Sequence, residues 1–439
     1  MVHDITQVAQ RMKTMIPNRG VILLVVLWLL VILSAMAIGF GHTMLVEYRI
    51  AANDISRMKN MQLAKSGIEW SIALLASDST ERGTLTGKLR LPEENFNQVA
   101  CGEGTYTLFI ENRTDENKTE YGLMDENSKI NINSASKETL MKLPGVDEII
   151  ADSIIDWRSA TAKASALGAK DEYYSQLSTP YLCKNAPFDT IEEILLVKGM
   201  TPALLYGEDA NLNGVLDPNE NDGDGSFPPD NSDGTLDKGM YPYITVYSYD
   251  WNQAFDGTKR ININQARQND LRQLSNYGLT NSDISNIISA RRNRQFQTIA
   301  DLLDVNGITS AKFGAIADYI TTSQREKLIG LVNVNTAPRE VLLAIPGIDE
   351  TAADKIIERR IGAEGPFTDL GQVASAIGKA SMKKASDSIT LRSSQFTIQS
   401  VGALSGRQGK VRLMAVVDRS VIPIQYLYFR DISYLGAGL

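Results

Sequence analysis

The chain carries one long apolar run, VILLVVLWLLVILSAMAIGFG, at residues 21–41, and no Asp, Glu, Lys or Arg interrupts it. A helix of about 20 apolar residues is long enough to cross a bilayer once. The preceding segment contains Arg11, Lys13 and Arg19, and basic residues favour the cytoplasmic side of a membrane. The sequence therefore predicts a single-pass membrane protein whose larger, C-terminal part is exported.

The residue before the apolar run suggests how the N-terminus is processed. Gly20 abuts Val21, so cleavage between them would remove a basic leader, residues 1–20, and keep the membrane helix, residues 21–41. An uncleaved signal anchor would not need this Gly. An ordinary signal peptide would be cut after its apolar core, where SAMA at 34–37 offers a passable small-residue site.

We favour cleavage after Gly20 because the helical pattern continues beyond the membrane segment. From His42 to Ala76 apolar residues recur at three- and four-residue spacings, and no Pro occurs between Pro17 and Pro92. The recurring residues include Met44, Leu45, Ile50, Ile55, Met58, Met61 and Leu63. A leader that ends in Gly, followed by a helix half in lipid and half on a globular head, resembles the class III leaders of type IV pilins and pseudopilins.

The composition limits the function classes. A length of 439 residues with 43% hydrophobic residues suits two to four packed domains. The net charge of −8 argues against a nucleic-acid partner, whose binding surface would be basic. The two His residues, His3 and His42, are not placed for catalysis. Cys101 and Cys183 would both be exported, so they form either one disulfide or two unpaired thiols.

Segments with β-type alternation occur at both ends of the exported part. They lie at 105–110, 121–125 and 128–133, and again at 395–401, 410–418 and 424–429. We expect one antiparallel sheet packed on the long helix, which is an α+β fold of the pilin type. Its first part would be 42–133 and its C-terminal strands 387–439. Residues 134–386 would form a large, mostly helical insertion.

The insertion contains internal repeats. An I-N-I-N or V-N-V-N segment opens a repeat at 130–133, 261–264 and 332–335, and a short helix then leads to a tight turn at Gly145, Gly278 or Gly347. A related turn occurs at Gly199. A second helix follows each turn, which is the pattern of a helix-hairpin-helix unit.

Helix-hairpin-helix units often bind DNA, and that function is the alternative here. The DNA-binding form needs a second Gly two residues after the first, so that backbone N–H groups reach a phosphate. These positions hold Asp147, Thr201, Thr280 and Asp349 instead. Carboxylates there would repel a phosphate, so the sequence favours a helical interaction module without nucleic acid.

A candidate calcium loop, DANLNGVLDPNE, lies at 209–220 inside the insertion. Oxygen-bearing side chains fall at positions 1, 3, 5, 9 and 12 of a twelve-residue loop, and Gly214 at position 6 allows the sharp turn. The candidate ligands are Asp209, Asn211, Asn213, Val215 through its carbonyl, Asp217 and Glu220. The flanking helices are short, so the loop is EF-like without a full EF-hand. Asn at two positions predicts a weak, extracytoplasmic site.

A second acidic run follows the calcium loop. It contains Asp222, Asp224, Asp230, Asp233 and Asp237 among Gly and Pro residues. The run would either hold another calcium ion or remain a solvated loop, because charge runs usually face water.

With these parts in place, the chain resembles the K minor pseudopilin family of the type II (general) secretion pathway. The resemblance rests on Arg19-Gly20 with residues 23–30, on the Asn-rich repeat starts, and on 188–200 and 209–220. It implies an inner-membrane anchor, a prepilin peptidase that also methylates the new N-terminus, and calcium in the insertion. It further implies a periplasmic place at the pseudopilus tip beside the I and J minor pseudopilins.

The residue at position 25 suggests how a subunit of this family would act in the filament. Most pilin-like subunits carry Glu at the fifth mature position, where it is thought to meet the N-terminal amine of a neighbour, whereas this chain has Val25. A buried carboxylate without a partner is costly in lipid. A subunit that is first in the filament has no neighbour above it and can lack the acid, so we expect a cap that helps to initiate assembly.

One alternative to this hypothesis remains. The chain would otherwise be a minor or tip pilin of a related type IV pilus or uptake system, which would share the leader and the long helix. No residues resemble a nucleophile with its base, a phosphate loop or a catalytic metal site. The sequence therefore predicts a protein that is not an enzyme.

Overall fold

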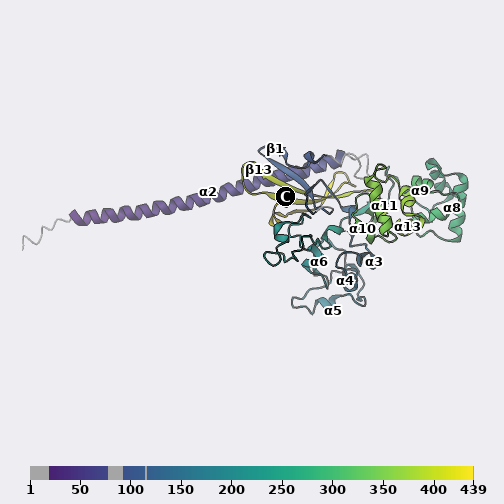
Figure 1. Cartoon of the computed structure of the whole chain (residues 1–439), viewed down its shortest axis with the longest axis horizontal. Coiled ribbons are helices and arrows are strands. Elements are labelled where there is room, and N and C mark those ends of the chain that lie inside the picture. Colours follow the sequence, from purple (N-terminus) through teal and green to yellow (C-terminus); the bar gives the residue numbers. More distant parts are fainter. Residues whose placement is uncertain (1–18, 78–91, 114–115, 439) are drawn as a thin grey trace, which may run out of the picture. The chain divides into compact units, whose positions relative to one another are not determined.

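The computed structural model describes residues 19–77, 92–113 and 116–438 (Figure 1). The predicted leader therefore lies outside the described residues except for Arg19 and Gly20. The chain divides into two compact units, residues 1–59 and 60–439, and each is described by itself.

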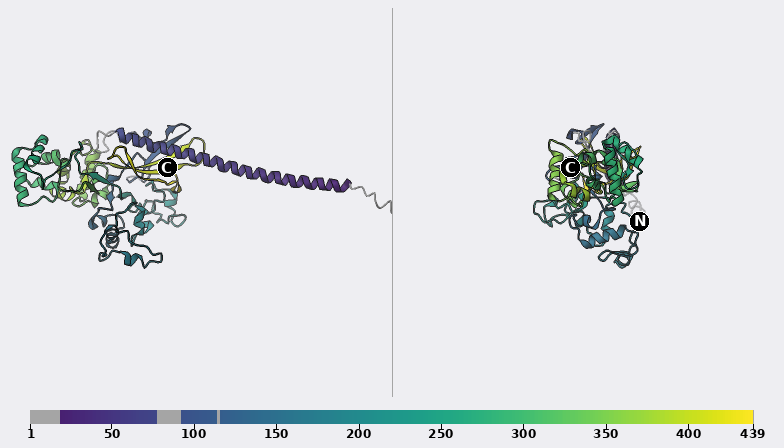
Figure 2. Two further views of the ribbon diagram at one scale, coloured as in Figure 1. Left: turned by 180° about the vertical axis from the view of Figure 1, so that it is seen from behind. Right: turned by 90° about the vertical axis from the view of Figure 1, so that its right-hand side faces the viewer.

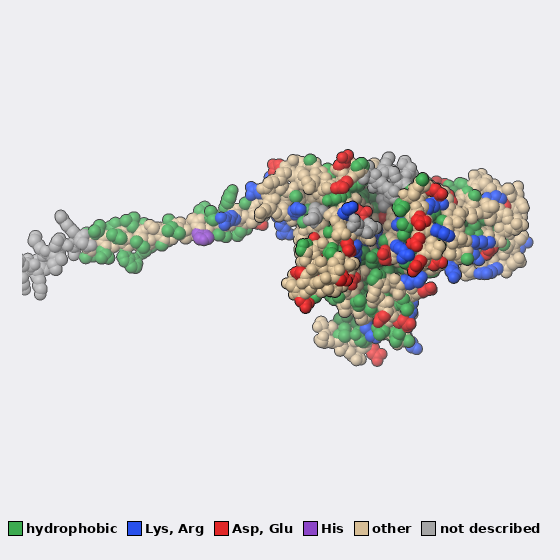
Figure 3. Space-filling model, in the orientation of Figure 1, with side chains coloured by type: hydrophobic (Ala, Val, Ile, Leu, Met, Phe, Trp, Pro, Cys, Tyr) green, Lys and Arg blue, Asp and Glu red, His purple; other side chains and the backbone are tan. Residues whose placement is uncertain are grey.

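The first unit consists of the N-terminal part of one uninterrupted helix, α2 (Arg19–Ser77). Its apolar side chains from Val21 to Met58 are exposed, and Figure 3 shows hydrophobic side chains along this segment. Among the described residues, α2 is the one helix whose length and composition allow it to cross a membrane. The structure thus agrees with the predicted membrane span and with its helical continuation.

The second unit is built around a seven-stranded antiparallel sheet. Five strands lie in the order β1-β2-β13-β14-β15, and β3 and β4 pair with β2 and β13. The strands are β1 (Val99–Cys101), β2 (Gly104–Ile110), β3 (Glu120–Tyr121), β4 (Met124–Asp125), β13 (Gln395–Leu404), β14 (Val411–Asp418) and β15 (Gln425–Asp431). The prediction that segments from both ends of the exported part form one sheet is confirmed.

The C-terminal end of α2 packs on this sheet, as Figure 2 shows for the yellow C-terminal strands. Ala64, Ile68 and Leu75 share a buried cluster with residues of β2, β13 and β14. Gly402 on β13 permits the close approach, because a Cβ there would lie 2.0 Å from the carbonyl oxygen of Asn60. The Asn60 side chain accepts the Leu404 N–H at 2.8 Å and donates to the Gly409 carbonyl.

The insertion begins earlier and ends later than predicted. Residues 128–133 were expected to continue the main sheet, but β5 (Ile130–Asn131) pairs in parallel with β6 (Ile244–Thr245). The same pairing recurs between β8 (Ile261–Asn262) and β9 (Ile320–Thr321), and between β11 (Val332–Asn333) and β12 (Ile389–Thr390). The I-N-I-N segment therefore belongs to the repeats, and the insertion spans about 130–390.

The first strand of each parallel pair begins a repeat and the second strand ends it. Each repeat contains two helical hairpins. The first contains α3 (Lys137–Leu140), α4 (Glu148–Arg158), α5 (Asp171–Tyr174), η3 (Glu192–Leu196), α6 (Pro202–Tyr206), η4 (Pro218–Glu220) and η5 (Tyr241–Tyr243). The second contains α7 (Gln268–Arg272), η6 (Gln273–Tyr277), α8 (Asn281–Asn293), η7 (Ile299–Asp304) and α9 (Ser310–Ala317). The third contains α10 (Arg339–Ala344), α11 (Glu350–Ile361), α12 (Leu370–Ile377) and α13 (Lys379–Ala385). Outside the repeats lie η1 (Glu93–Asn95), η2 (Glu126–Ser128), β7 (Tyr249–Trp251), β10 (Lys327–Ile329) and η8 (Ser433–Leu435).

One Asn in each repeat holds its two hairpins together. Asn335 donates its side-chain amide to the Phe367 carbonyl at 3.0 Å and accepts the Phe367 N–H at 2.8 Å. Asn133 makes the same two bonds with Phe188, and Asn264 makes them with Phe296. The side-chain amide thus satisfies a backbone N–H and C=O where the chain is not in regular structure.

One Arg in each repeat holds the repeat start. Arg291 donates to the carbonyls of Ile263 and Ala266, each at 2.8 Å. Arg360 makes the matching bonds at 2.9 and 2.7 Å in the third repeat, and Arg158 contacts the corresponding carbonyls in the first. These carbonyls follow the opening strand, so the charge-assisted bonds fix the strand on the second helix of the first hairpin.

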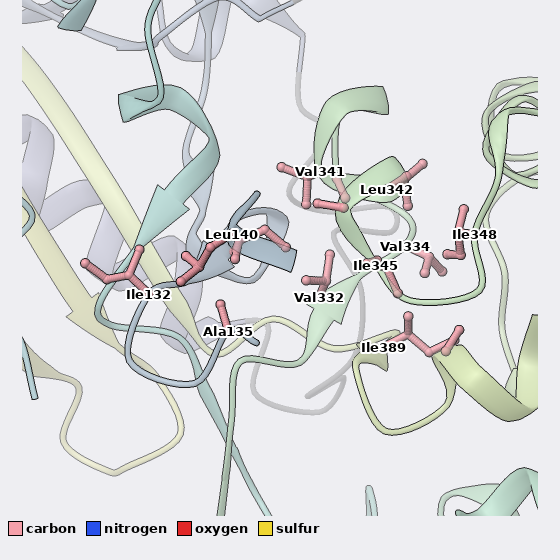
Figure 4. Packing of buried hydrophobic residues seen from close by; sticks show 14 of the residues in the cluster. Ile132, Ala135, Leu140, Val332, Val334, Val341, Leu342, Ile345, Ile348 and Ile389 are labelled. Atoms are coloured by element: carbon pink, nitrogen blue, oxygen red, sulfur yellow. The ribbon is translucent and has the colours of Figure 1, made fainter. Parts of the chain in front are cut away.

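A single apolar cluster runs through all three repeats. Figure 4 shows Ile132 and Leu140 of the first repeat together with Val332, Leu342 and Ile345 of the third. The internal repeats therefore share one core, as expected for units too small to bury their apolar faces alone.

The insertion meets the sheet at the polar turn η2, which directly follows β4. Asp125 accepts hydrogen bonds from Ser393 at 2.6 Å, from Thr336 at 2.5 Å and from the Asn333 side chain at 3.2 Å. Glu126 accepts from Thr397 on β13 at 2.7 Å and forms an ion pair with Lys129. This turn thus connects the sheet to the third repeat through buried carboxylates.

We expect the substitution Asn335→Ala to lower the free energy of unfolding by about 2–6 kcal/mol. It would leave two buried backbone groups of Phe367 without partners, at about 1–3 kcal/mol each. Asn264→Ala is the matched control and should cost less, because Asn264 is only half-buried and water can replace its bonds. Urea unfolding measures the free energy of unfolding of both variants. Equal, small losses would contradict the role given to the buried Asn335 side chain.

Candidate metal site

The predicted calcium loop follows α6 and ends in η4, and its two terminal carboxylates are buried. Asp209 and Glu220, at positions 1 and 12, are each 1% exposed. Asp209 accepts the N–H groups of Asn213 at 3.1 Å and Gly214 at 2.9 Å. Glu220 accepts those of Ala210 at 2.9 Å and Asp217 at 3.0 Å. The two terminal carboxylates therefore tie the loop into a ring.

The intermediate ligand positions meet inside this ring. The side chains of Asn211 and Asn213 both donate to the same oxygen of Asp217, at 2.5 and 3.2 Å. Positions 3, 5 and 9 of the loop are thus brought together as the spacing predicted. Gly214 adopts a φ of +70°, the left-handed conformation that position 6 requires.

The loop offers oxygen atoms of the kind that a hard cation accepts as ligands. The side-chain oxygen of Asn211 is buried and has no hydrogen-bond partner, which costs free energy unless a ligand or ion satisfies it. Within the described residues, no group of three or more His, Cys, Asp or Glu side chains is arranged to hold a metal ion. A cation in this loop would therefore depend on amide and backbone oxygens as well as carboxylates, which is the chemistry that Ca²⁺ accepts.

The electrostatics of the loop also favour positive charge. Burial raises the pKa of Glu220 to about 7, and the nearby carboxylates of Asp209 and Asp217 contribute to the increase. Burial likewise raises the pKa of Asp209, although the N–H groups of Gly214 and Asn213 oppose that change. A divalent cation would reverse this effect by stabilising the ionised carboxylates.

The second acidic run does not form a matching cluster. Asp230 accepts the N–H groups of Asp222, Gly223 and Ser232, and Asp222 accepts that of Ser226. Asp233 and Asp237 accept from backbone N–H groups two residues further on, and no hydrogen bond places Asp224 with them. These four carboxylates accept backbone N–H groups within the run and are not arranged around a common point, so the structure favours the solvated-loop alternative.

The two cysteines are free thiols. Cys183 is buried in the core of the repeats, whereas Cys101 on β1 packs beside the separate core between α2 and the sheet. Because they belong to different cores, the disulfide alternative is not formed, and the alternative of two unpaired thiols describes this structure.

The hairpin positions that would contact DNA are used as helix caps. Asp147 and Asp349 accept the N–H groups of Ile150 and Ala352, each at 2.8 Å. Thr201 and Thr280 cap α6 and α8 in the same way. The side chains thus occupy backbone donors that a phosphate would need. Sequence reasoning missed two further turns, at Gly307 and Gly378, which complete the second and third repeats.

The loop is also attached to the sheet, which the sequence did not predict. Arg412 on β14 donates to the carbonyls of Asn211 at 2.6 Å and Leu212 at 3.1 Å. The Asn112 N–H, just after β2, donates to the Asn213 carbonyl at 3.0 Å. The signal for Arg412 was present, because it is the one charge in the apolar stretch VRLMAVV at 411–417.

A long N-terminal helix, an antiparallel sheet and a helical insertion define this protein as a pilin-like subunit. Comparison with protein families gives matches to Type II secretion system (T2SS), protein K, at residues 122–206 and 332–392. Both segments match the protein K family of the type II secretion system, and the fold agrees with that of a minor pseudopilin. A Helix-hairpin-helix motif model matches 257–321, and a SAM-like Helix-hairpin-helix tandem model matches 299–360, in agreement with the repeats.

The solved structures similar to the chain include one from enterotoxigenic Escherichia coli, described as the crystal structure of the GspK-GspI-GspJ complex of the Type 2 Secretion System. The similarity has a TM-score of 0.47 and 11% sequence identity, and covers 87% of this chain and 99% of the other. No curated protein matches the sequence.

We expect Gly214→Ala to lower the free energy of unfolding by more than about 2 kcal/mol. Ala in the left-handed region costs roughly 1–2 kcal/mol, and its Cβ would lie 2.1 Å from the Asn112 carbonyl oxygen, so the loop must move off the sheet. Gly234→Ala is the matched control, because Gly234 also has a positive φ but no atom within 4 Å of the added Cβ. Urea unfolding in chelator compares them, and similar losses would show that the contact with Asn112 is unimportant.

Proposed function

We propose that this chain acts as a minor pseudopilin that caps the tip of the pseudopilus and helps to initiate its assembly for protein export across the outer membrane. The observation that carries the proposal is Val25, an exposed residue of α2 at the position where other pilin-like subunits have Glu. A subunit with no neighbour above it needs no carboxylate there, and burying one unpaired would be costly. The large insertion supports the proposal because it would obstruct another subunit stacked above.

Anchoring and processing follow from the N-terminus. Cleavage after Gly20 by a prepilin peptidase, with methylation of Val21, would leave the apolar part of α2 in the inner membrane. Basic residues in the leader favour an orientation with the sheet and the insertion in the periplasm. Gly20 next to an uninterrupted apolar helix supports this pathway.

Partners are expected along α2 beyond the membrane segment. Met44, Tyr48, Ile55 and Met58 are exposed on one face of α2, and an exposed apolar stripe of this length is typical of a helix that packs against other subunits. We infer that the I and J minor pseudopilins cover this stripe at the tip. Calcium would order the 209–220 loop, and no catalytic step is involved.

The assembly part of the proposal is tested with the full chain in detergent and the I and J homologues of its own operon. We expect a complex with the summed mass by light scattering. Ile55→Glu should weaken it at least tenfold by placing a charge in the apolar stripe, whereas Asn53→Glu, an exposed polar position on the same helix, should not. If the three proteins remain separate at micromolar concentration, the tip proposal fails.

The calcium part is tested by calorimetry and thermal unfolding of the full chain. Binding to the folded form alone stabilises it by about 2.7 kcal/mol when calcium is at a hundred times its Kd. Asp209→Ala and Glu220→Ala should each remove most of the stabilisation that calcium gives. Each should therefore lower the melting temperature measured in calcium more than the melting temperature measured in chelator. Asp233→Ala, in the second acidic run, should retain that stabilisation. Identical wild-type melting curves in calcium and in chelator would exclude the site.

A further inference from the structure

Arg412 is a cation in an unusual place. It lies near the start of β14, is 1% exposed, and is the largest fully buried side chain among the described residues. Burial lowers its pKa to about 10. A buried charge costs several kcal/mol unless it is paired and hydrogen-bonded, so its partners indicate what the charge does.

Those partners come from both the sheet and the calcium loop. The Arg412 guanidinium donates from Nε to the side-chain oxygen of Gln399 on β13 at 3.1 Å, and lies 4.8 Å from the ring centre of Phe109 on β2. Its two terminal nitrogens donate to the carbonyls of Asn211 and Leu212. One rigid group therefore connects two strands to positions 3 and 4 of the loop.

The loop residues that Arg412 holds control the geometry of the site. Leu212 has a φ of +56°, a conformation that a branched residue keeps only when its surroundings enforce it. The carbonyl of Asn211 is bound by Arg412, while its side-chain oxygen is the buried atom without a partner. Fixing the backbone of Asn211 thus fixes the direction of a candidate calcium ligand.

The charge of Arg412 also bears on the carboxylates beside it. Asp209 and Glu111 both act on Arg412 and favour its protonated form. Lys129, Arg113 and Lys238 are the other cations that act on Glu111. Without Arg412, the loop would keep its carboxylates but lose a cation that stabilises the ionised form of Asp209 beside the sheet.

We propose that Arg412 is the positioning residue that couples calcium binding in the insertion to attachment of the insertion on the pilin sheet. This inference rests on the proposed calcium site. Because coupling is reciprocal, calcium should tighten the contact with β14 and β2, and loss of the contact should weaken calcium binding.

The test compares the full-length wild type in detergent with Arg412→Lys and Arg412→Met. Arg412→Lys keeps the charge but cannot span both carbonyls and Gln399, so we expect a Kd for calcium at least tenfold higher. Calcium should also slow amide exchange in 110–113 and 411–414 of the wild type, and in neither variant. The matched control is Arg291→Lys, another Arg that holds two carbonyls, which should lower the melting temperature but leave the Kd unchanged.

Each outcome is decisive. If the wild type binds no calcium, the calcium site itself is wrong and the coupling falls with it. If the wild type binds calcium and the Arg412 variants keep its Kd within twofold, with equal losses of melting temperature in calcium and in chelator, Arg412 is only structural and the coupling is overturned. If Arg412→Met does not fold, Arg412→Lys and Gln399→Met provide the same comparison.

Discussion

Four residues at the junction of β4 and the insertion, Asp125 to Ser128, hold the second unit together. The carboxylates of Asp125 and Glu126 are almost completely buried, and burial raises the pKa of Asp125. Hydroxyl and amide groups from β13, from β6 and from the third repeat satisfy them. Buried polar groups of this kind are costly when unsatisfied, so they specify one arrangement of the surrounding elements. The first and the third repeat and the sheet all contact this one turn.

The repeats use the same small set of contacts three times. Asn fixes the start of the second hairpin to the start of the first, and Arg fixes the opening strand to the following helix. Neither contact depends on the length of the intervening segment. The first repeat can therefore carry the long calcium loop between its second hairpin and its closing strand, while the second and third repeats close directly.

The sequence predicted what depends on local pattern. Alternation located β2, β13, β14 and β15, and ligand spacing brought Asn211, Asn213 and Asp217 together as expected. It failed where pairing decides the structure: Ile130–Asn131 has the composition of a sheet strand, but its partner is Ile244–Thr245, more than a hundred residues later. Arg412 was missed for a related reason. Alternation assigns it to one face of β14, but only the folded chain shows that the calcium loop covers that face.

The pairing of β4 with β13 has a consequence for how such a subunit can evolve. Asp125 pairs with Phe396 and Met124 with Thr397, so the residues that flank the insertion on either side are neighbours in one sheet. Every repeat likewise begins and ends on adjacent parallel strands. Whole repeats can therefore be inserted or deleted at this point without changing the path of any strand in the sheet. The pilin part and the insertion are in this sense separate modules, free to diversify at different rates.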